Sequence, residues 1–347
     1  FPDATTLTLS DGVGTDGIDT ITGVETLQFT DTAVALGSRS ITGDGGNNSF
    51  VLAANQSGVT VTSGGGSDTV TLSGTSSDTN SVTLSSISSI IGSAGTDNVT
   101  FATALNNHSV DLGLGNDTAT LADGGNIQTF QNVEHIIGGT GNDNIASSTA
   151  FSAADSVTVD GGAGTDNLNL SGAGNNTVTV TNVETINGGN AIDTIIATGA
   201  TPVTIIGGAG ADVLTGGTGS DVFTYSTVTD SAIGAMDRIT NFVAGGMGDK
   251  IDTNIFGMIS VIGDQATGDT FANLSLSTLN TLVNSTNGTL GTRLTGDITN
   301  TQVMQFTTTD SKIVWAIDVN ASGVFDASDT IIDMTGVTGT INAADFV

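Results

Sequence analysis

Short runs of alternating apolar and polar residues recur along the chain, and each run follows a glycine-rich turn. The clearest example is GGAGADVLTGGTGSDVFT, from Gly207 to Thr224, in which one nine-residue repeat occurs twice. Glycines open each copy, an Asp follows, and Leu214 or Phe223 stands two positions after that Asp. Alternation with a period of two is typical of a strand with one buried face. Each copy therefore predicts a tight turn, which glycine permits, and then a brief strand whose Leu or Phe points inward.

The same repeat recurs over much of the chain with varying fidelity. Self-similarity at a short fixed period is the sequence mark of a solenoid. Two repeats complete one coil, with one turn on each side, so we predict an all-β fold built on a parallel β-roll, or β-helix, solenoid. The further copies are VGTDGIDTI (Val13–Ile21), GDGGNNSFV (Gly43–Val51), SGGGSDTVT (Ser63–Thr71), GSAGTDNVT (Gly92–Thr100), LGLGNDTAT (Leu112–Thr120), GGTGNDNIA (Gly138–Ala146), GGAGTDNLN (Gly161–Asn169), SGAGNNTVT (Ser171–Thr179) and GGNAIDTII (Gly188–Ile196).

The repeats stop at Tyr225, and a different pattern follows. In DRITNFVAGGMGDKID (Asp237–Asp252), the apolar residues Ile239, Phe242 and Ile251 are spaced as anchors. A solenoid needs a cap at its open end, and we expect these residues to provide it.

A small C-terminal β cap with one short helix is predicted beyond this segment. Apolar residues at helical spacing predict the helix over Thr270–Asn284, and two alternating runs around Thr308–Lys312 predict a hairpin over Val303–Val319. We therefore divide the chain into an N-terminal β segment with degenerate repeats (1–42), a β-roll (43–224) and a cap that contains a secretion signal region (225–347).

Composition indicates how such a roll is held together. The 347 residues include 35 Asp and Glu but only 5 Lys and Arg, giving a formal net charge of −30. Only Glu25, Glu134 and Glu184 are Glu, so nearly all of the acid is Asp, the carboxylate that suits turns. There is no Cys to form a disulfide. The scarcity of basic residues excludes nucleic acid and anionic membrane surfaces as partners, and no apolar run is long enough to insert into a bilayer.

Calcium in the turns satisfies these constraints. It accepts six to eight oxygen ligands in loose geometry, and a glycine turn supplies bare carbonyls beside the Asp carboxylate. We therefore predict several Ca²⁺ ions, held by the Asp and Gly of the turns. The predicted ligands are Asp16, Asp68, Asp97, Asp117, Gly138, Gly141, Asp143, Gly161, Gly164, Asp166, Asp193, Gly207, Gly208, Gly210, Asp212, Gly216, Gly217, Gly219 and Asp221.

Some repeats depart from the pattern. Asn48 and Asn176 stand in the Asp position of their repeats. Asn tolerates the left-handed backbone conformation without adding charge, so we expect it to preserve the turn there. Because successive Asp residues are separated by even or odd numbers of repeats, the calcium sites should be interrupted and distributed over both sides of the roll.

A Val-Glu motif recurs between the repeats. It appears in GVETLQF (Gly23–Phe29), NVEHIIGG (Asn132–Gly139) and NVETINGG (Asn182–Gly189). Glu134 and Glu184 each fall near the Asp position of a degenerate repeat. They are interpreted either as strand-edge residues that accept a hydrogen bond from a neighbouring turn or as calcium ligands.

A second calcium pattern lies near the C-terminus in DVNASGVFDASD (Asp318–Asp329). Its potential ligands stand at the first, third, fifth, ninth and twelfth positions of the segment, with Gly323 at the sixth, where an EF-hand loop turns sharply. An EF-hand would have a bidentate Glu at its last position and helices on both sides, so a solvated hairpin loop is the alternative. The potential ligands are Asp318, Asn320, Ser322, Asp326 and Asp329.

Nothing in the sequence supports catalysis. The two His, His108 and His135, lie outside any HExxH motif, there is no Cys nucleophile, and no Ser lies in a G-x-S-x-G elbow. We therefore predict that the chain is not an enzyme.

Over roughly residues 12–224 the repeats resemble those of RTX proteins, the hemolysin-type calcium-binding family. Asp237–Asp252 resembles the stretch that follows the β-roll in serralysin-like proteases, whose zinc site has no counterpart here. The ending INAADFV is similar to theirs and implies export by type I secretion machinery with an uncleaved C-terminal signal. The Val-Glu-Thr segments, the predicted helix and hairpin, and DTIIDMTGVTG resemble the C-terminal part of calcium-dependent bacterial surface-layer (S-layer) proteins of the Caulobacter kind.

We therefore predict a secreted structural protein that depends on calcium and self-assembles at or outside the surface of a Gram-negative bacterium, as an S-layer or filament subunit. Its partners are then further copies of itself and, during export, the secretion machinery. The alternative is a calcium-triggered folding and secretion module of a larger RTX adhesin or secreted hydrolase. A chain that begins at Phe1 rather than Met is expected to be a processed product or a fragment.

Overall fold

The computed structural model describes residues 7–9, 26–29, 39–152, 154–227, 229–253, 260–266, 274–275, 279, 302–319, 325–340 and 342–347. It divides into an N-terminal unit, Phe1–Leu168, and a C-terminal unit, Asn169–Val347. Each is described by itself.

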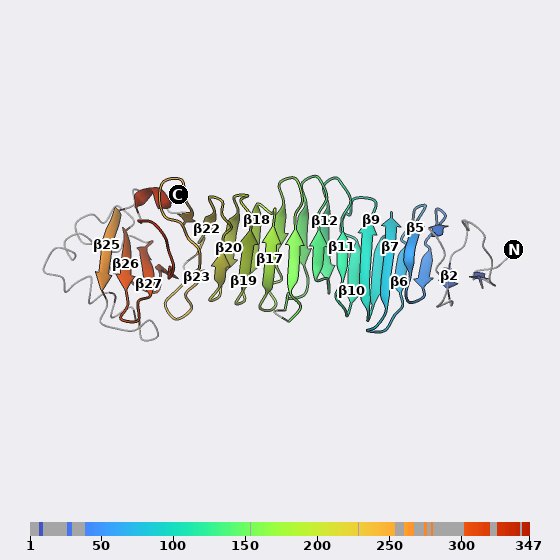
Figure 1. Cartoon of the computed structure of the whole chain (residues 1–347), viewed down its shortest axis with the longest axis horizontal. Helices are drawn as coiled ribbons and strands as arrows, with labels where there is room; N and C mark the ends of the chain where they lie inside the picture. Colours follow the sequence, from blue (N-terminus) through green and yellow to red (C-terminus); the bar gives the residue numbers. More distant parts are fainter. Residues whose placement is uncertain are drawn as a thin grey trace. The chain divides into compact units, whose positions relative to one another are not determined.

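In the N-terminal unit, successive described strands from β2 onward alternate between two parallel sheets, as expected for a coil of two repeats (Figure 1). One sheet contains, in order, β1 (Leu7–Leu9), β2 (Thr26–Phe29), β4 (Ser49–Leu52), β6 (Thr69–Leu72), β8 (Ser89–Ser93), β10 (Ser109–Gly113), β12 (Ile127–Gln131) and β14 (Asn144–Ser147). The other contains β3 (Arg39–Thr42), β5 (Ser57–Thr62), β7 (Thr79–Ser85), β9 (Thr96–Phe101), β11 (Thr118–Thr120), β13 (His135–Ile137) and β15 (Val157–Asp160). Strand β16 (Asn167–Asn169) spans the boundary between the units.

The core of this unit is a set of apolar ladders, because each inward residue pairs with the inward residue of the next coil. Phe50 pairs with Val70, Val70 with Ile90, and Ile90 with Val110. These four side chains are buried, as are their counterparts on the other sheet. The inward apolar residue that the sequence pattern predicts is therefore confirmed.

The C-terminal unit continues the same architecture with its own coils. One sheet contains β18 (Thr185–Gly189), β20 (Thr204–Gly208), β22 (Val222–Thr224) and β24 (Lys250–Asp252). The other begins with β17 (Thr177–Thr181), β19 (Thr194–Thr198), β21 (Val213–Thr215) and β23 (Arg238–Ile239). Val178, Ile195, Leu214 and Ile239 form its buried ladder.

The cap extends this second sheet. Strand β28 (Thr330–Asp333) pairs in parallel with β23, β27 (Ile313–Asp318) pairs antiparallel with β28, and β26 (Gln302–Thr307) pairs antiparallel with β27. The edge strand β25 (Ser260–Ala266) lies parallel to β26, and a 3-10 turn, η2 (Ala343–Asp345), follows near the C-terminus. The all-β solenoid with a β cap is thus confirmed.

The predicted hairpin and cap core are also confirmed. The Thr308 N–H donates to the Lys312 carbonyl across the hairpin turn at 2.9 Å. The ring of Phe242 meets that of Trp315 edge-on, with centroids 5.3 Å apart, and Trp315 also packs on Phe346. The predicted anchor residues, including Phe242, are all buried.

Most of the predicted helix, Thr270–Asn284, lies outside the described residues. Within it, Leu279 is helical and buried, and its N–H donates to the Ser275 carbonyl at 3.0 Å.

Candidate metal sites

The Asp residues of the repeats form ladders in which each carboxylate accepts a hydrogen bond from a backbone N–H of the preceding coil. In the turns that lead into β17, β19, β21 and β23, the Asn176 N–H donates to Asp193 Oδ1 at 2.7 Å, and the Asp193 N–H donates to Asp212 Oδ1 at 2.8 Å. The Asp212 N–H donates to Asp237 Oδ1, also at 2.8 Å. The Ser231 hydroxyl accepts from the Asp237 N–H at 2.8 Å and so ends the ladder.

Equivalent ladders lie on the other side of this unit and on both sides of the N-terminal unit. All of these bonds have the same form: a backbone N–H donates to one carboxylate oxygen of the following coil. The donor and acceptor residues are Val203 and Asp221, Asp221 and Asp249, Asn48 and Asp68, Asn126 and Asp143, Asp143 and Asp166, Asp97 and Asp117, and Asp117 and Glu134. Acidic turns therefore lie on both sides of the roll, and the distribution of calcium over them stays a prediction.

The second oxygen of most of these carboxylates faces no hydrogen-bond donor. Within the described part of the chain, the Oδ2 atoms of Asp68, Asp117, Asp143, Asp193, Asp212 and Asp221 are buried without a hydrogen-bond partner. Burying a polar group without a hydrogen bond costs roughly 2–7 kcal/mol, and burying a bare charge costs far more. A carboxylate in this position therefore requires either a cation or a proton beside it.

Burial shifts the pKa of these carboxyls accordingly. Desolvation raises the pKa of Asp117 and of Asp212 to about 7, and neighbouring acids add to the effect. Desolvation and the Asp212 charge raise the pKa of Asp237 to about 9. The same burial raises the pKa of Asp193 and Asp221. The hydrogen bonds that these carboxylates accept therefore do not offset the cost of burying their negative charge.

In several repeats the first glycine leaves an oxygen-lined space beside the unpartnered oxygen. A Cβ at Gly207 would lie 2.6 Å from Asp212 Oδ2 and 3.3 Å from Asp237 Oδ2. At Gly188 a Cβ would meet Asp193 Oδ2 at 2.8 Å and also the Gly207 carbonyl oxygen of the next coil. Carboxylate and carbonyl oxygens that converge on one space are the ligand set that calcium prefers, so the residues present fit that ion.

Most of the other glycines that were predicted as ligands serve the same close approach or the turn conformation. A Cβ at Gly138 would meet Asp143 Oδ2 and the Gly161 carbonyl, and one at Gly216 would meet Asp221 Oδ2. Positive φ values occur at Gly141, Gly164, Gly208 and Gly210, and Cβ atoms at Gly217 and Gly219 would approach the carbonyls of Gly199 and Ala200.

Carboxylates alone do not make these sites. Among the described residues, no three Asp, Glu or His side chains gather closely enough to hold a metal ion. A cation in a turn would therefore take most of its ligands from backbone carbonyls, with one or two carboxylates from adjacent coils.

Asp97 differs from the other predicted ligands. Its Oδ2 accepts from the Ser93 N–H at 2.6 Å, and its Oδ1 accepts from Asn80 Nδ2 at 2.7 Å. Ser93 stands where most repeats have a glycine, and its hydroxyl also donates to Asp97 Oδ1 at 3.2 Å. Protein donors therefore satisfy both oxygens of this buried carboxylate. Asp16 lies outside the described residues.

Two ladder residues, Asp237 and Asp249, were missed by the repeat search because no glycine turn precedes them in the usual form. Both nevertheless keep the ending of the repeat, an Asp followed two positions later by a buried Ile, in Asp237-Arg238-Ile239 and Asp249-Lys250-Ile251. That ending was the signal by which they could have been found.

The Val-Glu motif supplies a ladder acceptor in at least one place. Glu134 Oε2 accepts from the Asp117 N–H at 2.8 Å, which confirms the hydrogen-bonding interpretation for this residue. Asn132 and Asn182, which open two of these motifs, have φ values of 52° and 51°. Asn48 and Asn176, which were expected to preserve their turns, do so without a positive φ.

The C-terminal acidic loop is only partly described. Asp318 and Asp329 are buried, Asp329 Oδ1 accepts from the Val319 N–H at 3.1 Å, and its Oδ2 accepts from the Asp326 N–H at 2.7 Å. Desolvation, with smaller contributions from Asp318 and Asp326, raises the pKa of Asp329 to about 7. The predicted ligands Asn320 and Ser322 lie outside the described residues, so calcium binding here stays a prediction.

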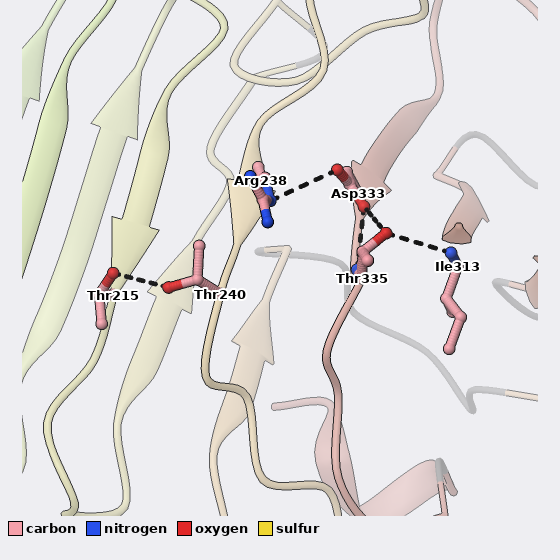
Figure 2. A network of polar contacts seen from close by, with 6 residues as sticks. All are labelled: Thr215, Arg238, Thr240, Ile313, Asp333 and Thr335. Carbon is pink, nitrogen blue, oxygen red and sulfur yellow. Dashed lines mark hydrogen bonds and ion pairs between the residues drawn. The ribbon is translucent and has the colours of Figure 1, made fainter. Parts of the chain in front are cut away.

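Polar contacts connect the last strands of the roll to the cap (Figure 2). Arg238 Nε lies 3.8 Å from Asp333 Oδ2, and the Thr335 N–H donates to Asp333 Oδ1 at 2.9 Å. The Thr335 hydroxyl accepts from the Ile313 N–H at 3.3 Å. Next to this network, the hydroxyls of Thr215 and Thr240 are 2.7 Å apart. These contacts tie β28 to β23, directly after the ladder residue Asp237.

Comparison with known proteins agrees with this architecture. Residues 148–273 match the family model of the Peptidase M10 serralysin C terminal, a segment that includes the ladder from Asn176 to Asp237. A search of curated proteins found no significant match. In the described part of the chain, no helix is long and apolar enough to cross a membrane. Residues 148–273 are therefore similar to the serralysin C-terminal region, in line with the resemblance noted in the sequence.

Proposed function

We propose that the protein is a secreted, calcium-dependent structural protein that assembles outside the bacterial cell, as an S-layer or filament subunit. One observation carries the calcium proposal: a buried Asp Oδ2 without a donor recurs in the turns, and at Asp143 and Asp193 it lies beside a carbonyl oxygen of the next coil. Bound calcium would supply positive charge there, joining two coils through oxygens that otherwise repel each other.

The best-supported positions are Asp143, Asp193, Asp212 and Asp221, because each has both the unpartnered oxygen and the glycine space. Magnesium fits them less well, since it demands a strict octahedron and dehydrates reluctantly.

Calcium binding would couple folding to secretion. A chain with a net charge of −30 repels itself when extended and has few large apolar side chains to offset that repulsion. Such a chain would pass through a type I exporter unfolded and fold where calcium is abundant, because metal binding energy becomes folding energy. The similarity of residues 148–273 to the serralysin C terminal supports export of this kind.

Self-assembly is the finer part of the proposal. Among the described strands, β1 ends one sheet of the N-terminal unit and β25 ends one sheet of the C-terminal unit. A strand edge with free N–H and C=O groups is a template for another chain, and contacts between unlike surfaces propagate as open arrays.

The match to a protease C terminal favours a second candidate, a folding and secretion module of a larger RTX adhesin or hydrolase. Such a module would share the calcium chemistry but would need no lattice contacts.

Circular dichroism of the whole chain, first in chelator and then with added calcium, tests the calcium proposal. We expect a largely disordered chain that gains strand content with calcium and not with magnesium. Strand content that chelation leaves unchanged would contradict the proposal. Light scattering of the calcium-loaded protein then separates the two candidates, since assembly predicts particles that grow with protein concentration.

A further inference from the structure

Asn residues in the Asp position of the repeats donate hydrogen bonds to oxygens of the turn. Asn126 Nδ2 donates to Asp143 Oδ1 at 2.8 Å, to the Gly124 carbonyl at 2.9 Å and to the Ala122 carbonyl at 3.0 Å. Two oxygens of its own turn and one of the next coil therefore surround this amide nitrogen. The residue is fully buried.

The same arrangement recurs in the C-terminal unit. Asn176 Nδ2 donates to Asp193 Oδ1 at 2.8 Å, to the Ser171 carbonyl at 3.0 Å and to the Gly174 carbonyl at 3.2 Å. In the N-terminal unit, Asn80 shows part of the same arrangement. Its Nδ2 donates to Asp97 Oδ1 at 2.7 Å and to the Ser73 carbonyl at 3.2 Å. Three turns on different coils thus place an amide nitrogen among oxygens.

Asn and Asp have the same shape, and the ladder treats their Oδ1 atoms alike. Asn126 Oδ1 accepts from the Leu105 N–H at 2.9 Å, just as Asp143 Oδ1 accepts from the Asn126 N–H at 2.7 Å. The two residues differ only in the second atom. In Asn126 it is a donor with three oxygen partners, whereas in Asp143 it is a buried oxygen without a donor.

We propose that Asn in the Asp position is a built-in substitute for the cation, so that the turns of Asn126 and Asn176 need no calcium. The choice between Asn and Asp at each position then sets which turns bind an ion, how many ions the chain takes up and how strongly each stretch depends on calcium. This inference rests on the proposed calcium binding and deepens it.

The proposal also explains how calcium-free turns coexist with calcium-binding ones. The amide of Asn176 donates to Asp193 and the amide of Asn126 donates to Asp143, so each partly compensates the next carboxylate of its ladder. Each Asn–Asp pair therefore links two adjacent coils by a hydrogen bond that does not require calcium.

Reciprocal substitutions in one ladder of the full-length chain test this. Asp193→Asn retains the Oδ1 acceptor and replaces the unpartnered Oδ2 with an amide donor, as in Asn176. We expect about one bound calcium fewer per chain, strand content in chelator at least equal to wild type, and an unchanged calcium midpoint. Asp193→Ala should lose the same ion but raise the midpoint several-fold.

The opposite change, Asn176→Asp, should add about one bound calcium and lower the strand content in chelator, since two carboxylates then face each other in adjacent turns. Asn144→Asp is the matched control, because it adds the same charge at an exposed strand position. Bound calcium is counted by atomic emission after gel filtration, and strand content is followed by circular dichroism.

The outcomes separate this inference from the proposed function. If the wild-type chain binds no calcium, both are wrong. If it binds calcium but Asp193→Asn behaves like Asp193→Ala, or if Asn176→Asp leaves the ion count unchanged, the substitution idea is overturned while calcium-dependent folding stands.

Discussion

At the scale of single residues, the ladder carboxylates should be distinguishable from exposed acids. Asp212→Ala or Asp221→Ala removes both the acceptor for the preceding coil and a proposed calcium ligand. We expect each to raise the calcium midpoint of folding and to lower the free energy of unfolding by about 1–3 kcal/mol. Asp155→Ala is the control, because this carboxylate is exposed. Equal midpoints for all three variants in a titration followed by circular dichroism would refute the assignment.

Asp78 shows why a residue outside the repeats is not automatically neutral. Asp78 Oδ2 accepts from both the N–H and the hydroxyl of Thr75 at 2.7 Å, and its Oδ1 accepts from Asn55 Nδ2 at 2.6 Å. These bonds lower the pKa of this exposed carboxyl. Asp78→Ala should therefore loosen its own turn but leave the calcium midpoint unchanged.

The pH dependence without calcium follows from the raised carboxyl pKa values. Asp212 has a pKa of about 7 in the fold against an ordinary value of 3.8. Its contribution to stability is therefore present below about pH 4 and lost as the pH rises through about 7. Asp237, with a pKa of about 9, extends the loss to higher pH. In chelator, strand content should fall from pH 4 to pH 9.

Calcium reverses this trend, because a ligand must release its proton to bind. The calcium midpoint should therefore decrease as the pH rises over the same range. A parallel pH response with and without calcium, measured by circular dichroism, would contradict the role assigned to the buried carboxylates.

The role of a site residue could be predicted where it depends on the sequence of its own repeat. It could be predicted less well where it depends on a contact with the next coil. Asp212 and Asp221 were found because glycines precede them in the sequence. Asp97 has hydrogen-bond donors for both carboxylate oxygens, and one of these donors is the Ser93 N–H. The serine is visible in the sequence, but only the structure shows that it donates to Asp97. The hydrogen bonds of the Asn176 amide were not predicted, because one of its partners, Asp193, lies one coil away.

At the scale of elements, the same distinction explains what was predicted of the fold. Strands such as β21 and β22 follow from period-two alternation within each repeat, and the hairpin of β26 and β27 follows from two adjacent runs. The parallel pairing of β28 with β23 brings together segments far apart in the chain, and no local pattern encodes it.

The cap core should contribute more to stability than the polar network beside it. Phe242 is buried against Trp315 and Phe223, and Phe242→Ala should cost roughly 3–5 kcal/mol. Exposure of the neighbouring indole should shift Trp315 fluorescence to longer wavelength. Met247→Ala is the control, because that side chain is 92% exposed.

Arg238→Met, by contrast, removes an ion pair whose Arg side chain is 48% exposed, so solvent screening limits its effect to about 0–1 kcal/mol. An equal loss of stability in Arg238→Met and Phe242→Ala, measured by urea unfolding in calcium, would show that the network of Figure 2 rather than the aromatic core holds the cap.

At the scale of the whole molecule, calcium should trigger folding and assembly together. The net charge of −30 opposes the packing of copies until bound calcium reduces it. Strand β1 pairs with β2 on one edge, and no described strand pairs with its other edge. A segment of alternating residues, TLTLSDG (Thr6–Gly12), surrounds β1 and could extend the pairing to a second copy.

Deleting Phe1–Ser10 therefore separates the two events. The shortened chain should fold with the wild-type calcium midpoint, because the ladder carboxylates of 43–249 remain in place. Its assembly should be weaker, because β1 is the edge that would receive the neighbour. Circular dichroism measures the first property, and light scattering across millimolar calcium and rising protein concentration measures the second. If the full-length chain folds with calcium but stays monomeric throughout, the secretion module is the better account of the protein, since the edge of β1 then recruits no second copy.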